Sequence, residues 1–248
     1  MFDNPFSIQG KTVLVTGASS GIGASIAITL SNWGANVIIT GRNEERLYKT
    51  FCTIGKNPNN MMITADLTQR DNLDKLTATL PCIDGIILCA GIVKTSPVKN
   101  ISDKAIDEIF EINTMSNIRL CQRILKSKKI NKGSSVVFIS SVSTFNVKIG
   151  NSLYSATKGA INSFAKAMAL ELAPRRIRVN VIQPGFIHTG LLNSGIITNE
   201  QIEEYIAKHP LGVGEASDIA NLCIYLLSDA SRWMTGSILT IDGGLTLR

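Results

Sequence analysis

Short runs of apolar and β-branched residues recur along the chain, and segments with helical periodicity separate them. Seven runs are expected to be strands: TVLVT from residue 12, NVIIT from 36, MMITA from 61, GIILC from 85, SVVFIS from 135, RVNVIQ from 178 and SILTI from 237. Most of them show no alternation of apolar and polar positions, which is typical of strands covered on both faces. The pattern therefore predicts an α/β fold with a parallel sheet between two layers of helices.

The first segment between strands predicts an amphipathic crossover helix. Ile22, Ile26, Leu30 and Trp33 recur at helical spacing, and Gly34 is placed to end the helix. No internal repeat or linker-like composition interrupts the pattern, so we expect a single domain over residues 1–248. The longest insertion, residues 190–210 between the sixth strand and the last helix, is expected to be a substrate lid.

Composition restricts the class of protein. The 248 residues are 44% hydrophobic and 18% charged, as in ordinary globular proteins, and the longest apolar stretch, GIILCAGIV, is too short to span a bilayer. The five cysteines are scattered without a CxxC pair, and the chain has only two histidines. This argues against a disulfide framework and against a metal site. We expect a cytoplasmic protein with reduced thiols and no membrane partner.

The net charge of +6 is spread along the chain apart from KSKK at 126–129 and RR at 175–176. Each cluster closes a helical pattern, where cations complement the helix dipole. An acidic protein partner is the alternative. Nucleic acid is not expected as a partner, because no aromatic residues are interleaved with the charges.

A glycine-rich loop follows the first predicted strand. In TGASSGIG, Gly17, Gly21 and Gly23 stand at the turn into the helix, where glycine lets the backbone approach a pyrophosphate and free amides can bind it. The spacing differs from G-x-G-x-x-G, and such a loop is weak evidence by itself. Its place in the first strand–helix unit favours a dinucleotide site.

The end of the second predicted strand is expected to select the form of the dinucleotide. An acidic residue there would bind the ribose hydroxyls and repel a 2′-phosphate, but Gly41 and Arg42 follow instead. NADP(H) is therefore favoured over NAD(H), although Arg42 could also be a solvated residue before the next helix. Asp66, at the end of the third strand, could cap the following helix or accept a hydrogen bond from the adenine amine.

A tyrosine and a lysine stand four positions apart in YSATK. Tyr154 and Lys158 should share one face of a helix. An ammonium beside a phenol favours the phenolate, and with an oxidised nicotinamide it could move the phenol pKa from about 10 toward neutrality. Tyr154 is therefore a candidate proton donor and acceptor. Upstream, Ser140 and Ser141 end the fifth strand and could either hold a substrate oxygen or cap the chain.

Together these motifs resemble the short-chain dehydrogenases/reductases over essentially the whole chain. TGASSGIG matches the family's glycine loop, YSATK its tyrosine–lysine motif and QPGFIHTG its PGxxxT pattern. Ser141 precedes the tyrosine by thirteen positions and Asn113 precedes it by 41, as in the family. The resemblance implies a single Rossmann-like, doubly wound parallel sheet and the catalytic set Asn113, Ser141, Tyr154 and Lys158.

The resemblance also implies the role of each residue. Tyr154 would protonate a ketone oxygen as the nicotinamide gives up hydride, and Ser141 would hold that oxygen. Lys158 would bind the nicotinamide ribose and acidify the phenol, and the backbone of Asn113 would anchor a relay water. The implied cofactor-binding residues are Gly17, Ser19, Ser20, Gly21, Ile22, Gly23, Arg42, Asp66, Leu67, Cys89, Ala90, Gly91, Tyr154, Lys158, Pro184, Gly185, Ile187 and Thr189.

One departure from the family follows the fourth strand. Cys89 stands where the family has an asparagine that braces the central strands. We expect a local change in sheet hydrogen bonding with activity retained, and a redox role for the thiol is the alternative.

The chain looks most similar to the 3-oxoacyl-acyl-carrier-protein reductases of fatty acid biosynthesis. This implies a small-molecule or carrier-linked ketone substrate, with acyl carrier protein as a possible partner and Lys132 and Arg175 near the site entrance, although both could be helix-end cations. The resemblance also implies a homotetramer formed through helices near 102–130 and 152–173. Residues that could line an acyl or ring pocket are Val142, Phe145, Val147, Phe186, Leu191 and Leu192.

Other activities remain as alternatives. Relatives that act on sugars, steroids or other alcohols carry similar phrases, and a non-catalytic dinucleotide-binding regulator is a different class. An enoyl reductase is disfavoured, because that branch spaces its tyrosine and lysine farther apart.

Overall fold

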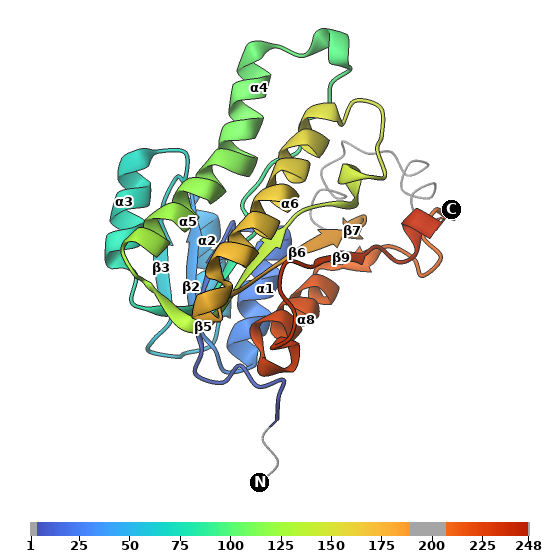
Figure 1. Ribbon diagram of the computed structural model, residues 1–248. Helices are drawn as coiled ribbons and strands as arrows, with labels where there is room; N and C mark the ends of the chain where they lie inside the picture. The colour runs from blue at the N-terminus through green and yellow to red at the C-terminus, as the bar shows by residue number, and fades with distance from the viewer. Residues whose placement is uncertain (1–3, 189–206, 248) are drawn as a thin grey trace.

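The computed structural model describes residues 4–188 and 207–247, and its centre is a parallel sheet (Figure 1). The strands follow the order β3-β2-β1-β4-β5-β6-β9. They are β1 Thr12–Thr16, β2 Asn36–Gly41, β3 Met61–Thr64, β4 Ile83–Leu88, β5 Ile130–Ile139, β6 Arg178–Pro184 and β9 Ile238–Ile241. The doubly wound fold and the seven predicted strands are confirmed. The strand order reverses between β1 and β4, where doubly wound sheets open a ligand crevice.

Helices cover both faces of the sheet. One face carries α1 Gly21–Asn32, α2 Glu44–Thr53 and α8 Ala216–Leu227, and the other carries α3 Arg70–Thr79, α5 Ser116–Lys126 and α6 Ser152–Leu172. Helix α4, Asp103–Phe110, continues into α5 through one π-helical turn, η2 Glu111–Met115, and extends beyond the sheet (Figure 1).

Short elements complete the described chain. They are the turns η1 Val98–Asn100, η3 Val142–Thr144, η4 Ala173–Arg175, η6 Asp229–Ser231 and η7 Leu245–Leu247, and the paired strands β7 Ile187–His188 and β8 Gly214–Glu215. No described helix is long and apolar enough to cross a membrane.

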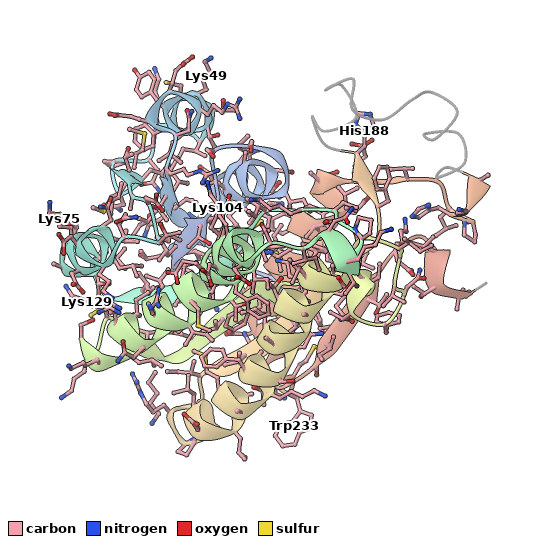
Figure 2. The ribbon with its side chains drawn as sticks, turned by 90° about the horizontal axis from the view of Figure 1, so that it is seen from above. Lys49, Lys75, Lys104, Lys129, His188 and Trp233 are labelled. Atoms are coloured by element: carbon pink, nitrogen blue, oxygen red, sulfur yellow. The ribbon has the colours of Figure 1, made fainter. Side chains whose placement is uncertain are left out.

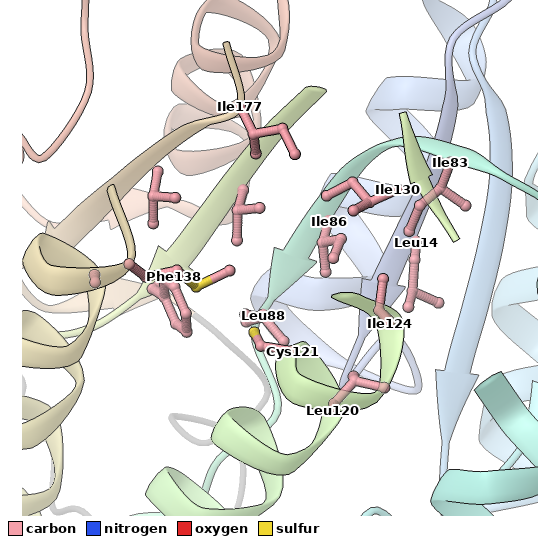
Figure 3. Close-up of a cluster of buried hydrophobic side chains, with 14 of the residues drawn as sticks. Leu14, Ile83, Ile86, Leu88, Leu120, Cys121, Ile124, Ile130, Phe138 and Ile177 are labelled. Atoms are coloured by element: carbon pink, nitrogen blue, oxygen red, sulfur yellow. The ribbon is translucent and has the colours of Figure 1, made fainter. Parts of the chain in front are cut away.

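Two hydrophobic cores explain why the strand sequences lack alternation. In β1, Leu14 belongs to the cluster beneath α3, α5 and α6 (Figure 3), whereas Val13 and Val15 belong to the cluster beneath α1 and α8. Successive side chains of a strand point to opposite faces, so a strand covered on both faces is apolar throughout. Each of these buried side chains contributes on the order of 1.5–3 kcal/mol.

Local sequence sets the limits of individual elements. Helix α1 ends where predicted, because Gly34 adopts a φ of +81° directly after the helix. Strand β5 begins at Ile130, earlier than the predicted start at 135, because Ile130 pairs with Ile83 of β4 across an irregular register. The polar residues after Ile130 conceal this extension in the sequence.

Most of the expected lid falls on residues 189–206, which lie outside the described residues. Three residues expected to bind the cofactor or line the pocket, Thr189, Leu191 and Leu192, fall in the same range and are likewise not described. The lysines labelled on helices in Figure 2 lie on separate elements: Lys49 on α2, Lys75 on α3 and Lys104 on α4. Positive charge on these helices is therefore dispersed.

Candidate active site

The loop after β1 lies with its backbone against the end of β4. A Cβ on Gly17, whose φ is +66°, would lie 2.9 Å from the backbone of Ala90, and one on Gly23 would lie 2.3 Å from the carbonyl oxygen of Gly17. The hydroxyl of Thr16 accepts bonds from the amides of Cys89, at 3.0 Å, and Ala90, at 3.1 Å. Glycine is therefore required at both positions, and the loop and the β4 end form one rigid wall.

The start of α1 lies within this loop. Ser20 is the N-cap residue in extended conformation, and Gly21, the first helical residue, has a φ of +55°. The first amides of a helix have no partner inside it, so this terminus offers donors and positive potential to an anion. Ile22 is half-buried against the α1–α8 core.

Cys89 has taken over the position of the family's bracing asparagine without a comparable side-chain bond. Its backbone amide is instead satisfied by Thr16. Burial raises the pKa of the Cys89 thiol to about 11, with a smaller opposing effect from Lys158. A thiol with this pKa is protonated at neutral pH, which argues against the redox alternative.

The end of β2 lies beside the glycine loop. A Cβ on Gly41 would lie 3.4 Å from the Oγ atom of Ser19, an ordinary contact distance, and exposed Arg42 follows directly. A pocket of about 300 Å³ opens next to Ser19 and Ser20 between α1 and α2. Its basic side chains, Arg46 and Lys49, carry no motif that would mark them in the sequence. The lining residues are Ser19, Ser20, Ala24, Ile28, Arg46, Lys49, Thr50 and Thr53.

Asp66 closes the turn that leads into α3. Its Oδ1 atom accepts bonds from the Thr68 amide at 3.0 Å and the Thr68 hydroxyl at 2.8 Å. Neither bond reaches α3, whose N-cap residue is Gln69, so the structure does not show Asp66 capping this helix, and its bond to an adenine amine stays a prediction. Leu67 is 7% exposed and packs in the core, which fixes the backbone of this turn.

Lys158 is held inside the protein by α6. Its Nζ atom donates a bond of 2.8 Å to the carbonyl of Ile139 at the end of β5 and lies 5.8 Å from the ring centroid of Tyr154. Burial lowers the pKa of Lys158 to about 8. Burial also raises the pKa of Tyr154, and a hydrogen bond with Ser141 partly opposes this effect.

The expectation that Lys158 acidifies Tyr154 applies to the site with a bound nicotinamide and stays a prediction, because in the chain alone Lys158 is not among the causes of the Tyr154 pKa shift. The charge of Lys158 faces the carbonyl of Ile139, and desolvation of the phenol is the largest effect on its pKa. A phenol with a raised pKa is protonated at neutral pH. The chain alone thus keeps the phenol of Tyr154 in its neutral, protonated form.

Asn113 lies in the π-helical turn and joins the segment after β4 to α6. Its Oδ1 atom accepts from the Ile92 amide at 2.7 Å, and its Nδ2 atom donates to the Ile92 carbonyl at 2.9 Å and to the Thr157 hydroxyl at 3.1 Å. A Cβ on Gly91 would lie 3.2 Å from Oδ1 of Asn113 and 3.4 Å from Nζ of Lys158. Asn113, Gly91 and Lys158 therefore meet at one place.

The backbone carbonyl of Asn113, which the resemblance assigns to a relay water, accepts the Nδ2 atom of Asn117 at 2.8 Å. Asn117 is buried, and sequence analysis missed it, since no motif marks it. The carbonyl keeps one further lone pair, so a water would share it with this amide.

The two serines after β5 have different surroundings. The Ser140 hydroxyl is buried and donates to the Lys158 carbonyl at 3.3 Å. The Ser141 hydroxyl instead lies close enough to Tyr154 to lower the pKa of the phenol, and it accepts a hydrogen bond from the Ser143 amide at 3.1 Å. The structure therefore selects Ser141 as the serine beside the phenol.

The segment after β6 is also packed backbone to backbone. Pro184 ends the strand, the Gly185 amide donates to the Ile241 carbonyl at 2.9 Å, and Ile187 pairs with Gly214 in the small β7–β8 sheet. All these segments follow the carboxyl ends of parallel strands, so they lie at one edge of the sheet.

Lys132 and Arg175 do not lie at this edge. Lys132 is in the first half of β5, and the Nη2 atom of Arg175 donates to the carbonyl of Ile130 at the start of that strand, at 2.7 Å. The expectation that they flank the entrance of the chain's own site is wrong, because strand direction places them at the opposite edge from Tyr154.

Among the apolar residues expected to line a pocket, Val142 is only 6% exposed, whereas Phe145 and Val147 are 54% and 70% exposed. The Phe186 ring lies 6.4 Å from that of His209. Over residues 4–188 and 207–247, no cluster of three or more histidine, cysteine, aspartate or glutamate side chains could hold a metal ion.

The chain is similar to known proteins over nearly its whole length. A family model described as Enoyl-(Acyl carrier protein) reductase matches residues 17–246. The chain is 32% identical to the 3-oxoacyl-[acyl-carrier-protein] reductase of Rickettsia felis, with 97% of this chain and 98% of the relative covered. It is also 32% identical to a tropinone reductase homolog of Arabidopsis thaliana, with 99% and 96% covered.

A solved structure described as a short chain dehydrogenase/reductase family protein matches with a TM-score of 0.83 and 28% identity, over 96% of this chain and 99% of that chain.

Proposed function

The chain belongs to the short-chain dehydrogenase/reductase family of oxidoreductases, and on this premise we propose that it reduces a ketone to a secondary alcohol with NADPH. The observation that carries the proposal is the placement of Tyr154 beside Ser141 and 5.8 Å from the Lys158 amine, at the same sheet edge as the glycine loop. Two hydroxyls at one point can bind and protonate a carbonyl oxygen.

The residues present fit a dinucleotide. Gly17, Gly23 and Gly91 leave space where a Cβ would contact neighbouring atoms, and α1 begins in the loop with free amides. These residues, with Ser19, Ser20 and the backbone of Ile187, would hold the cofactor, which supplies the hydride when bound.

Side chains of the protein would then supply the proton that the ketone oxygen needs. Tyr154 remains protonated because burial raises its pKa, and it donates this proton to the ketone oxygen. Ser141 donates a hydrogen bond to the same oxygen and stabilises its developing charge. The side chains of Lys158 and Asn113 contact the backbone around Gly91 and fix its position in the site.

We further propose that NADP(H) is preferred. Arg42 follows β2 where an acidic residue would repel a 2′-phosphate, and Arg46 and Lys49 line the neighbouring pocket. A guanidinium is suited to a phosphate because its donors match two oxygens.

A 3-oxoacyl thioester is the substrate we favour, on the likeness to the Rickettsia felis reductase and on the exposed Phe145 and Val147 beyond Ser141. The tropinone reductase homolog is equally identical to this chain, so a cyclic ketone is the second candidate. The four-residue spacing of Tyr154 and Lys158 favours ketone over enoyl reduction. We also propose a homotetramer, for which Leu170 of α6, 80% exposed, offers apolar surface.

The test is NADPH oxidation with a panel of ketones that includes an acyl-carrier thioester, a steroid, tropinone and a nucleotide sugar. The proposal expects turnover of at least one ketone and faster turnover with NADPH than with NADH. Absence of turnover across the panel, with NADPH shown to bind, would favour a non-catalytic dinucleotide-binding regulator.

A further inference from the structure

Ser143 lies in the turn η3, two residues after Ser141, and the function proposed above does not use it. Its amide donates to the Ser141 Oγ atom at 3.1 Å, and its own Oγ atom accepts a hydrogen bond from the Ser141 hydroxyl, also at 3.1 Å. In the described part of the chain, the Ser143 hydroxyl has no other side-chain partner. The only side-chain hydrogen bond of the Ser143 hydroxyl among the described residues is therefore the one to Ser141, a proposed catalytic residue.

The number of donors and acceptors on a hydroxyl limits what Ser141 can do. Its oxygen carries one proton and two acceptor positions, and the Ser143 amide fills one of them. While Ser141 donates to Ser143, as it does in the free protein, its proton is not available to a ketone. If Ser143 donates to Ser141, both acceptor positions are filled, and Ser141 can only donate.

The second arrangement also affects Tyr154. The phenol can donate its proton either to Ser141 or to a ketone oxygen. A Ser141 oxygen that already accepts two bonds cannot accept the phenol as well. Both protons then have the ketone oxygen as their acceptor.

We propose that Ser143 is a positioning residue: when a ketone binds, the hydroxyl bond that Ser141 donates in the free protein reverses, so that Ser143 donates to Ser141 and both Ser141 and Tyr154 direct their protons to the substrate oxygen. This inference rests on the proposed ketone reduction. Hydrogen bonds in such a chain also polarise one another, which makes Ser141 a stronger donor.

The surrounding turn is rigid enough to maintain this geometry. The Thr144 hydroxyl donates to the Ser141 carbonyl at 3.2 Å and accepts the Nε2 atom of Gln183 at 2.5 Å. Gln183 belongs to β6 and is 3% exposed. The turn is thus fixed to the neighbouring strand through groups other than the Ser143 hydroxyl.

Because other groups fix the turn, the Ser143 hydroxyl can be removed without removing the bonds that hold the backbone. Ser143→Ala keeps the backbone amide that donates to Ser141 and removes only the hydroxyl. We expect the reductive kcat to fall about threefold to tenfold, the effect of one neutral hydrogen bond, with the KM for NADPH unchanged. Ser143→Thr, which restores a hydroxyl, should recover the rate.

The closing experiment combines Ser143→Ala with Ser141→Ala and uses Ser163→Ala, at an exposed position of α6, as the matched control. If Ser143 acts through Ser141, the double variant should be no slower than Ser141→Ala alone. An additional loss in the double variant, an unchanged rate in Ser143→Ala, or a loss that follows a lowered Tm would overturn the inference.

A second measurement needs no substrate. When Tyr154 ionises, Ser141 donates to the phenolate and Ser143 can donate to Ser141, so loss of the Ser143 hydroxyl should raise the pKa of Tyr154 further in an alkaline absorbance titration referenced to Tyr154→Phe. An unchanged pKa would contradict the inference even if no ketone is turned over. Failure of the ketone panel alone would instead contradict the proposed function.

Discussion

Replacement of Lys158 by methionine should stabilise the protein near neutral pH while it inactivates the site. Lys158 is 6% exposed, and burial lowers its pKa from 10.5 to about 8. Each pKa unit corresponds to about 1.4 kcal/mol, so the buried charge costs about 3 kcal/mol of folding free energy at neutral pH. The lost bond to Ile139 offsets part of this gain, by about 1–3 kcal/mol.

The pH dependence of the unfolding free energy separates the cost of the buried Lys158 charge from the loss of its hydrogen bond to Ile139. Between about pH 8 and pH 10.5 the unfolded chain binds the Lys158 proton and the folded chain does not, so wild-type stability rises with pH relative to the methionine variant. From pH 7 to pH 10 the advantage of Lys158→Met should shrink by about 2–3 kcal/mol, whatever the value of the lost hydrogen bond.

Urea unfolding of both proteins at these two pH values provides the measurement. Lys166→Met, which removes an exposed lysine from the same helix, is the matched control and should not reproduce the pH-dependent difference. A free-energy difference between Lys158→Met and wild type that does not change with pH would refute the conclusion that burial destabilises the charged amine.

Three further predictions concern the site. Arg42→Ala should weaken NADPH binding about tenfold to a hundredfold, the range for charge-assisted bonds, with little effect on NADH; equal losses measured by fluorescence titration would remove the case for the phosphate form. Gly91→Ala should lower kcat and cost about 1–3 kcal/mol of stability, because its Cβ would crowd Asn113 and Lys158; full activity at unchanged Tm would show that the contact is loose. Because burial raises the pKa of Tyr154, ketone reduction should keep its rate between about pH 6 and pH 8, whereas alcohol oxidation should accelerate as pH rises; the opposite trends in initial rates would argue against a protonated phenol.

The fold followed from local features of the sequence. Apolar runs without alternation report burial on both faces, and this property belongs to each strand by itself. Gly34 ends α1 because a single residue needs a positive φ there. The glycine loop was recognisable for the same reason, since backbone contact requires the absence of a side chain.

Features that depend on tertiary contacts could not be predicted in this way. Ser140 and Ser141 are equivalent in sequence, and only the packing of α6 beside β5 distinguishes them. The direction of the Lys158 amine depends on a carbonyl at the end of another element. Lys132 and Arg175 were misplaced because resemblance gives a position along the chain but not the edge of the sheet on which it lies.

The most direct test of a phenol that protonates a ketone is Tyr154→Phe, measured in parallel for NADPH affinity and for NADPH oxidation with the best ketone of the panel. The variant should bind NADPH like the wild type and lose about a hundredfold to ten-thousandfold in kcat, the range for general acid catalysis. A variant that keeps more than about a tenth of the wild-type rate would contradict the assigned role of Tyr154.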